Sequence, residues 1–348
     1  MSRARFGFRW YGPEDSIPIA HIGQIPCVSE IVSACYDVPS GELLPEENIA
    51  LRAQAARSAG MTFSVCEGLP VHESIKLGLP ERERFTDIYC QNIERLAAQG
   101  VEIICYNFMP LFGWLRTDLA YPLPDGSTTL AYDVEQLASL DPQSGEFALP
   151  GWHFSADISQ RRGMLAAYRE MGDEGLRENF VWFLRRIIPA AQRCGVRMAI
   201  HPDDPPLPVF GLPRIVSSAE DIRLMREAAP LDANGLTLCV GSLASGRGND
   251  VIAIAKEFAP HIPFVHARNV RHTDGDSFIE TAHSSACGEV DMTALLTALH
   301  RGGFDGVIRP DHGRMIFGES GKPGYGLYDR ALGVSYLSGV WEALCARL

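Results

Sequence analysis

Four residues that could together bind a metal ion follow apolar runs in the second half of the chain. They are His201, Cys239, His266 and Asp311. Two imidazoles, a thiolate and a carboxylate form a complete ligand set for a divalent metal, and the thiolate suits Fe²⁺, Zn²⁺ or Mn²⁺ better than Mg²⁺ or Ca²⁺. Their spacing matches no short metal motif, so only the fold can bring them together. Taken singly, each is more often a structural residue than a ligand.

Other polar residues at the ends of such runs could act on a substrate. His312 is a candidate general base because imidazole titrates near neutral pH, and the alternative is a supporting hydrogen-bond partner. Tyr325 lies between two glycines, as a gating aromatic residue or a proton donor. Arginines can bind a carboxylate in bidentate fashion or pair with acidic side chains of the protein. The residues expected to contact the substrate are Asn107, Arg268, Asn269, Arg309, His72 and His283.

Eight short runs rich in Val, Ile, Phe and Cys would have to position these residues. They span residues 8–12, 30–35, 62–68, 101–108, 197–203, 236–242, 262–269 and 306–313. Helical patterns lie between them, the clearest at 176–194 and at 291–300, where Asp291 is the expected N-cap. This alternation predicts an α/β fold with a parallel sheet, closed into a (β/α)8 TIM barrel. A doubly wound sheet would need a glycine-rich turn after the first strand, and none is present.

The barrel interpretation explains why the polar residues matter. Active sites of such barrels lie at the carboxyl ends of the strands. The four candidate ligands end the fifth to eighth predicted strands, so the barrel would gather them around one point at its mouth. Glu67 and Asp204 also lie at strand ends, without an assigned role.

Residues 109–172 interrupt the alternation between the fourth and fifth strands. They contain prolines and aromatic residues with little periodicity. A loop of that length is usually functional, so we expect a loop insertion that forms a lid or wall of the active site. A disordered insertion is the alternative, which the aromatic content disfavours. The length of 348 residues would suit two domains, but a single barrel domain over residues 1–348 also fits and is the prediction.

The composition indicates a globular protein of the cytoplasm. Hydrophobic residues make up 46% of the chain, and the net charge of −12 argues against a nucleic-acid or anionic-membrane surface. No stretch longer than 14 residues lacks a charged side chain, and no signal peptide is visible, so no membrane association is expected. The nine cysteines contain no CxxC pair. We expect most of them to be free thiols in the core, as in reducing compartments.

A series of longer motifs resembles the mannonate dehydratases of hexuronate breakdown, in their metal-dependent barrel form and shorter branch. The resemblance runs along nearly the whole chain. The motifs are Arg9-Trp-Tyr-Gly-Pro13, Pro70-Val-His-Glu73, Cys105-Tyr-Asn-Phe-Met-Pro110, His201-Pro-Asp-Asp-Pro-Pro206, Gly211-Leu-Pro-Arg-Ile215, Cys239-Val-Gly-Ser242, His266-Ala-Arg-Asn269, Arg309-Pro-Asp-His-Gly313 and Pro323-Gly-Tyr-Gly-Leu-Tyr-Asp329.

The resemblance implies a TIM barrel that binds Mn²⁺ or Fe²⁺ and dehydrates D-mannonate to 2-keto-3-deoxy-D-gluconate. By matching motif, the metal ligands would be His201, Cys239, His266 and Asp311, and the catalytic pair would be His312 and Tyr325. The family also suggests a homodimer. The C-terminal helix is a candidate interface through Tyr328, Tyr336 and Trp341. The alternative is that these residues pack against the barrel.

The chain departs from the family pattern in the wall of the expected site. The usual Asp-Trp-Thr-Arg is Gly113-Trp114-Leu115-Arg116 here, and serines replace other residues at Ser74 and Ser284. The substrate could therefore be a different hexonate. A metal-dependent sugar isomerase or epimerase and a paralogue that binds without turnover are further alternatives. The product of a dehydratase has lost one molecule of water, whereas the product of an isomerase keeps the mass of the substrate. The mass of the product would therefore separate the two functions.

Overall fold

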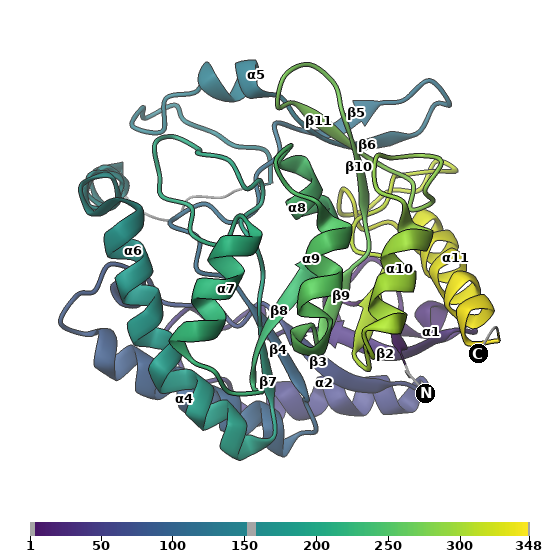
Figure 1. Cartoon of the computed structure of the whole chain (residues 1–348), viewed down its shortest axis with the longest axis horizontal. Helices are drawn as coiled ribbons and strands as arrows, with labels where there is room; N and C mark the ends of the chain where they lie inside the picture. The colour runs from purple at the N-terminus through teal and green to yellow at the C-terminus, as the bar shows by residue number, and fades with distance from the viewer. Residues whose placement is uncertain (1–3, 152–157, 347–348) are drawn as a thin grey trace.

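The central element is a closed barrel of eight parallel strands (Figure 1). The structure is a computed structural model that describes residues 4–151 and 158–346. Each strand pairs with its neighbours in chain order, and the last pairs with the first. The TIM-barrel prediction is therefore confirmed. The strands are β1 (Arg5–Arg9), β2 (Val28–Ser33), β3 (Thr62–Glu67), β4 (Ile103–Tyr106), β7 (Arg197–Ile200), β8 (Asn234–Cys239), β9 (Phe264–His266) and β12 (Val307–Arg309).

The predicted strands are all present, although several of their ends differ. β1 begins at Arg5 rather than at residue 8, and the run at 236–242 leaves the sheet at Cys239 to start a helix. The run at 262–269 divides into β9 and a separate strand. Apolar residues continue past the hydrogen-bonded ladder because they stay buried around the barrel mouth. Periodicity alone therefore does not mark where the ladder stops.

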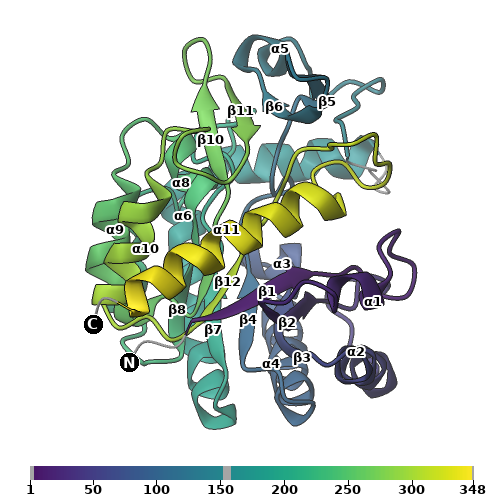
Figure 2. The ribbon, with the colours of Figure 1, turned by 90° about the vertical axis from the view of Figure 1, so that its right-hand side faces the viewer.

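Helices surround the barrel (Figures 1 and 2). The longer ones are α2 (Glu46–Ser58), α4 (Arg82–Ala98), α6 (Ile158–Cys194), α7 (Ala219–Ala228), α9 (Val251–Phe258), α10 (Met292–Arg301) and α11 (Leu327–Cys345). The short ones are α1 (Ile19–Ile22), α3 (Glu73–Lys76), α5 (Val134–Ala138), α8 (Val240–Ser245) and the 3₁₀ turn η1 (Ala259–His261). The helix predicted at 176–194 is the second part of α6, whose two parts meet at Gly172 with a φ of 64°. That conformation favours glycine.

Two cores stabilise this arrangement. The interior of the barrel is filled by Val32, Val65, Ile103, Cys105, Ala199, Phe264 and Val307. A larger core lies between the strands and the helices, and includes Phe180, Phe183, Leu184 and Ile187 on the buried face of α6. A filled barrel is typical of this fold and confines open space to the mouth.

A second, antiparallel sheet lies over the mouth of the barrel (Figure 2). Its strand order is β10 (Asn269–His272), β11 (Phe278–Thr281), β6 (Thr128–Tyr132) and β5 (Asp118–Pro122). The expectation of an irregular loop at 109–172 was wrong in part, because this segment contains β5, β6, α5 and the start of α6. Residues 152–157 of the segment lie outside the described residues. The strands β5 and β6 are short, and β6 pairs with the distant β11, so no local sequence pattern predicts them.

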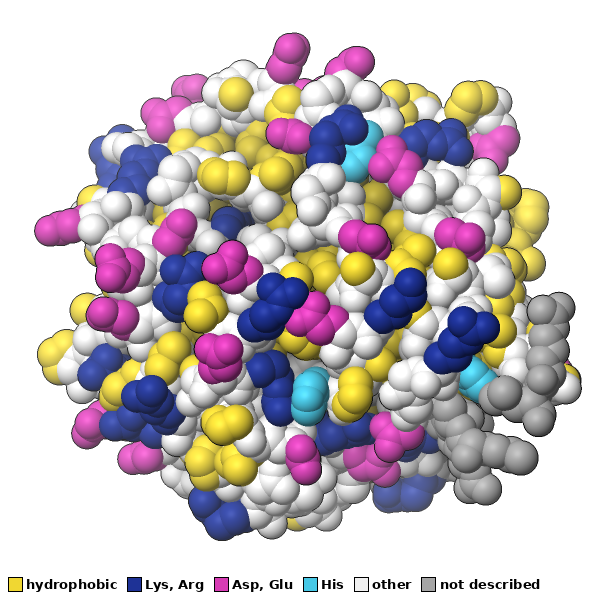
Figure 3. Space-filling view, viewed as in Figure 1, with side chains coloured by type: hydrophobic (Ala, Val, Ile, Leu, Met, Phe, Trp, Pro, Cys, Tyr) yellow, Lys and Arg dark blue, Asp and Glu magenta, His cyan; other side chains and the backbone are white. Residues whose placement is uncertain are grey.

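The surface and the cysteines agree only in part with the sequence-based expectations. Basic and acidic side chains are interspersed over the face in Figure 3. All nine cysteines are free, but only Cys35, Cys66, Cys105 and Cys239 are buried, so the expectation that most of them belong to the core was too broad. Among the described residues, no helix has the length and apolar character needed to cross a membrane.

The first prediction concerns the start of α10. Asp291 caps this helix, because its carboxylate accepts hydrogen bonds from the backbone N–H groups of Thr293 and Ala294, both at 3.0 Å. Asp291→Ala should lower the free energy of unfolding by about 1 kcal/mol. Asp291→Asn keeps a capping oxygen and should cost clearly less. Urea unfolding followed by circular dichroism measures both variants, and equal losses would contradict the capping role.

Candidate active site

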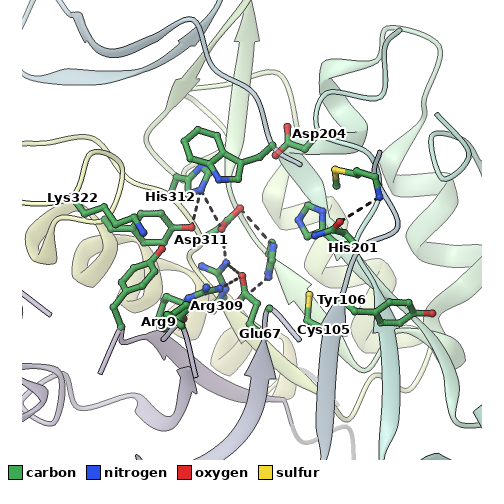
Figure 4. Close-up of a pocket in the computed structure, with 18 residues that line it drawn as sticks. Arg9, Glu67, Cys105, Tyr106, His201, Asp204, Arg309, Asp311, His312 and Lys322 are labelled. Carbon is green, nitrogen blue, oxygen red and sulfur yellow. Dashed lines mark hydrogen bonds and ion pairs between the residues drawn. The ribbon is translucent and has the colours of Figure 1, made fainter. Parts of the chain in front are cut away.

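A cavity of about 250 Å³ opens at the carboxyl ends of the barrel strands (Figure 4). Met109 and Trp114 contribute to its wall from the segment between β4 and β7. The location is the one expected for a barrel enzyme. Seven of the residues given a role from the sequence line it, namely Asn107, His201, His266, Arg309, Asp311, His312 and Tyr325.

Three of the four candidate ligands come together at this cavity, where His201 and His266 line the wall and Cys239 does not. One ligand atom from each of His201, Cys239 and His266 lies within 4.8 Å of the others. The fourth candidate is close by, since Asp311 Oδ2 lies 3.8 Å from Cys239 Sγ and 3.7 Å from His266 Nδ1. Figure 4 shows Asp311 between His312 on one side and His201 on the other. The strand ends therefore converge as the barrel requires.

The histidines have nitrogen atoms that are free to coordinate. His201 Nδ1 lies 2.7 Å from the carbonyl oxygen of Pro202, to which it must donate, so Nε2 is the ring nitrogen left to face the other candidate ligands. His266 is 1% exposed, and its contacts with Asp311 and Glu67 are 3.7 and 3.4 Å long. Neither of its ring nitrogens has a hydrogen-bond partner among the described residues. A buried imidazole without a partner, facing a thiol and a second imidazole, fits a metal ion.

The electrostatic surroundings of Cys239 also favour its role as a candidate metal ligand. Burial alone would raise the pKa of its thiol, but the positive charges of Arg268 and His201 hold the pKa well below the usual range. Ser242 Oγ also donates to the sulfur at 3.1 Å. Cys105 lines the same cavity, and burial raises the pKa of its thiol well above the usual range. The thiolate is the form that binds metals, so Cys239 is prepared for coordination and Cys105 is not.

Asp311 lies two residues after the end of β12 and has an unusual backbone conformation. Its φ of 61° lies in the left-handed region, which aspartate adopts more readily than most residues. The carboxylate pairs with Arg309 at 2.7 Å and with Arg268 at 2.8 Å. Burial would raise its pKa, but the positive charge of Arg309, the neighbouring imidazole of His312 and other nearby groups hold the pKa well below the usual range. The turn lets Asp311 and His312, although adjacent in sequence, both face the cavity.

His312 and Tyr325 form a hydrogen-bonded pair beside the candidate metal ligands. His312 Nε2 lies 3.0 Å from the hydroxyl of Tyr325. The other ring nitrogen, Nδ1, lies 2.9 Å from Oε2 of Glu280, which is on β11. Burial, the dominant cause, raises the pKa of Tyr325 well above its usual value. Sequence reasoning missed Glu280 because its strand belongs to the unexpected second sheet.

The two candidate arginines are both buried, but only one lines the cavity. Arg309 Nη2 pairs with Glu67 and Asp311, each at 2.7 Å. Arg268 is 1% exposed and donates to Asp204 at 2.6 Å and to Glu280 at 2.8 Å. Both arginines therefore pair with carboxylates of the protein, but Nε and Nη1 of Arg309 have no hydrogen-bond partner among the described residues. Substrate contact by Arg309 stays a prediction.

The remaining candidates for substrate contact lie outside the cavity, apart from Asn107, which lines it. Asn269 holds the backbone of Val290 through hydrogen bonds of 2.9 and 3.0 Å. His283 is buried with Nε2 2.6 Å from the carbonyl oxygen of Pro310. His72 caps α3 and borders a neighbouring cavity of about 340 Å³, which Asn107 also lines.

Several cavity residues had no assigned role. Arg9 ends β1, forms an ion pair with Glu67, and lies 5.0 Å from the ring centroid of Tyr11. Lys322 Nζ lies 3.7 Å from the same centroid. Trp114 packs against His312 with ring centroids 5.9 Å apart. The strand-end rule had already named Glu67, though without a role, and the observed end of β1 would have added Arg9. Lys322 lies in an irregular segment that no periodic pattern singles out.

The comparisons with known proteins agree on one family. A family model described as D-mannonate dehydratase (UxuA) matches residues 4–347. The chain is 50% identical over 339 residues to a mannonate dehydratase of Streptococcus agalactiae, with 97% of both chains covered. It is 45% identical over 342 residues to mannonate dehydratase 2 of Halalkalibacterium halodurans, covering 98% of this chain and 99% of that one. The crystal structure of mannonate dehydratase from Streptococcus suis serotype 2 superposes with a TM-score of 0.92 at 41% identity, covering 100% of this chain and 95% of that one.

The second prediction separates the two thiols of the cavity region. Cys239→Ala should bind Mn²⁺ well below stoichiometry, because it removes the thiolate from the ligand cluster. Cys105→Ala removes a protonated thiol and should keep the metal content of the unmodified protein. Plasma mass spectrometry of dialysed, Mn²⁺-loaded protein measures both. Full metal content in Cys239→Ala would contradict the assigned ligand set.

Proposed function

Because the chain belongs to the D-mannonate dehydratase family, we propose that it removes water from D-mannonate to give 2-keto-3-deoxy-D-gluconate. The observation that carries this proposal is that the candidate metal ligands and the His312–Tyr325 pair meet at one cavity. Removal of a proton and of a hydroxyl from adjacent carbons needs an acid and a base close together. The cavity supplies both beside a site for a cation.

The proposed metal ligands are His201, Cys239, His266 and Asp311, and the proposed ion is Mn²⁺ or Fe²⁺. The mixed nitrogen, sulfur and oxygen donors support such a borderline ion over Mg²⁺ or Ca²⁺. When bound, the ion would stabilise the negative charge that develops on the substrate carboxylate as the C2 proton leaves. The protein residues around it orient the substrate and move the protons.

We assign His312 as the base and Tyr325 as the acid. The C2–H bond breaks and its proton goes to Nε2 of His312, while the C3–O bond breaks and the departing hydroxyl takes the proton of Tyr325. The resulting enol becomes the 2-keto acid. Transfer of the proton from His312 to the phenolate, along their 3.0 Å contact, restores both groups. The balance is one water molecule lost, with no oxidant or reductant consumed.

The anionic substrate needs a positive group that the protein has not already neutralised. Arg9 and Arg309 are both paired with Glu67. Lys322 lines the cavity, and no carboxylate among residues 4–151 and 158–346 forms an ion pair with it. We propose that Lys322 attracts the substrate and helps to hold it beside Tyr325.

The wider setting is also a proposal. We propose a single domain over residues 1–348, with part of 109–172 as a wall of the active site, and a homodimer in the cytoplasm. The nine free thiols support a reducing compartment. Tyr328 on α11 is 47% exposed and available for an interface, whereas Trp341 is 5% exposed and packs against Phe304. Trp341 is thus a packing residue of the helix.

The third prediction tests the reaction itself. Metal-stripped protein reconstituted with Mn²⁺ should convert D-mannonate to a product that has lost one molecule of water, detected by mass spectrometry. His312→Asn should bind metal but lose nearly all turnover, because it lacks the base. A product of unchanged mass would indicate an isomerase or epimerase instead. Turnover of another hexonate but not of D-mannonate would point to the wall around Gly113 and Leu115.

The fourth prediction concerns the cation at the cavity mouth. Lys322→Met should raise the KM for D-mannonate roughly 3- to 30-fold, the range expected for one charged contact near solvent, with a smaller change in kcat. Lys256→Met removes an exposed lysine on α9, away from the cavity, and should change neither constant. Steady-state kinetics decide the matter: an unchanged KM in Lys322→Met would exclude the proposed role.

A further inference from the structure

Glu280 lies at the centre of a buried cluster of charges between the second sheet and the barrel. It is 3% exposed and stands on β11, opposite Val270 of β10. Its backbone carbonyl accepts a hydrogen bond of 2.9 Å from Thr129 of β6. Its side chain reaches Arg116, Arg268 and His312. The second sheet thus delivers one carboxylate to the rear of the candidate catalytic pair.

The two oxygen atoms of this carboxylate have different surroundings. Oε1 accepts from Arg116 Nε at 2.9 Å and Nη2 at 2.7 Å, and from Arg268 Nη1 at 2.8 Å. Oε2 contacts only His312 among the described residues, with Nδ1 at 2.9 Å. Nδ1 also lies 3.0 Å from Oε1. The arginines therefore fix the carboxylate by one oxygen and turn the other toward the imidazole.

We propose that Glu280 is a positioning residue that holds neutral His312 in the tautomer with its proton on Nδ1, so that Nε2 presents a lone pair to Tyr325 and the cavity. This inference rests on the proposed dehydration, because it states how the base of that reaction is prepared. An ionised carboxylate can only accept hydrogen bonds, so the imidazole nitrogen facing it must carry a proton. A neutral imidazole has one such proton, which leaves the other nitrogen basic.

The charge balance of the cluster keeps Glu280 ionised. Burial would raise the pKa of its carboxyl, but the hydrogen-bonded imidazole of His312 and the positive charges of Arg268 and Arg116 lower the pKa to about 2. When Nε2 takes the C2 proton of the substrate, the imidazole becomes a cation between Glu280 and the cavity. The carboxylate then stabilises that cation, as the buried aspartate does in serine-protease triads.

A purely structural role for Glu280 is the competing explanation. Asp204 already binds both arginines, at 3.0 Å for Arg116 and 2.6 Å for Arg268. Glu280 could be a second counter-ion that ties the sheet to the barrel and acts on His312 only incidentally. The two explanations differ in what happens to the imidazole when the carboxylate becomes an amide of the same shape.

Glu280→Gln makes that change. The position of Oε1 is surrounded by N–H donors, so the amide oxygen must occupy it, and the amide NH₂ then faces Nδ1 of His312. Nδ1 must accept this hydrogen bond, which moves the imidazole proton to Nε2. The lone pair facing Tyr325 is lost. With Mn²⁺ bound, kcat for D-mannonate should fall by up to about 10⁴-fold, the size of the effect when the orienting carboxylate of a triad becomes an amide, and KM should change little.

Nitrogen NMR of the imidazole gives a readout that does not depend on turnover. Protein labelled with ¹⁵N-histidine and loaded with diamagnetic Zn²⁺ should show His312 protonated on Nδ1, and Glu280→Gln should show it protonated on Nε2. The His312→Asn variant identifies the signals. The wild-type spectrum alone tests the proposal if Glu280→Gln does not fold, because a proton on Nε2 of wild-type His312 would overturn it.

Arg116→Gln is the matched control. It removes two hydrogen bonds to Glu280 from the same cluster but does not touch His312. It should lower the melting temperature while leaving the His312 tautomer unchanged and kcat well above that of Glu280→Gln. Combining Glu280→Gln with His312→Asn should cause no further loss of kcat, since residues that act as one unit are not additive.

The outcomes separate the inference from the proposed function. Wild-type protein that fails to dehydrate D-mannonate overturns the function, while the NMR measurement still decides the tautomer. Normal turnover in wild type with equal losses of kcat in Glu280→Gln and Arg116→Gln overturns the positioning role alone. An unchanged His312 tautomer in Glu280→Gln does the same.

Discussion

Charged groups that leave water must be compensated, and the mouth of this barrel is organised around that constraint. Arg116, Arg268 and Arg309 are at most 1% exposed, and each contacts carboxylates from other parts of the chain. Asp204 and Glu280 share the first two arginines. Arg268 also pairs with Asp311, so these contacts tie the residues that follow β7, β9 and β12 to the second sheet. The loops that carry the candidate ligands are thereby held in one arrangement.

The ion pairs that compensate these buried charges also place neighbouring residues in different surroundings. Arg268 lies behind Cys239 and favours its thiolate, and it also binds Asp311 and Glu280. The left-handed turn at Asp311 directs this carboxylate toward the candidate metal ligands and His312 toward Tyr325. The candidate metal ligands and the His312–Tyr325 pair thus lie next to each other. Asp311, the residue with the left-handed backbone conformation, lies between these two groups. Backbone strain is often found in functional sites.

Much of this arrangement could be predicted from local patterns. Each barrel strand is a short apolar run followed by a helix, and the polar residue that ends it is visible in the sequence. The rule that barrel chemistry lies at strand ends therefore predicts His201, Cys239, His266 and Asp311 as candidate ligands from the sequence alone. It did not identify Glu280. β10 and β11 have four residues each, and β11 pairs with a strand of the distant segment between β4 and β7.

The sequence by itself determined the barrel, the family and the polar residues at the strand ends, because these depend on periodicity and motifs within short stretches. Only the tertiary structure decided how those residues are used. Asn269 and His283 are engaged by backbone groups outside the cavity, and Arg268 is paired with acidic side chains. His312 acquires an orienting carboxylate that lies 32 residues away along the chain. Hydrogen-bond partners of buried polar groups are set by long-range packing, which no local pattern records.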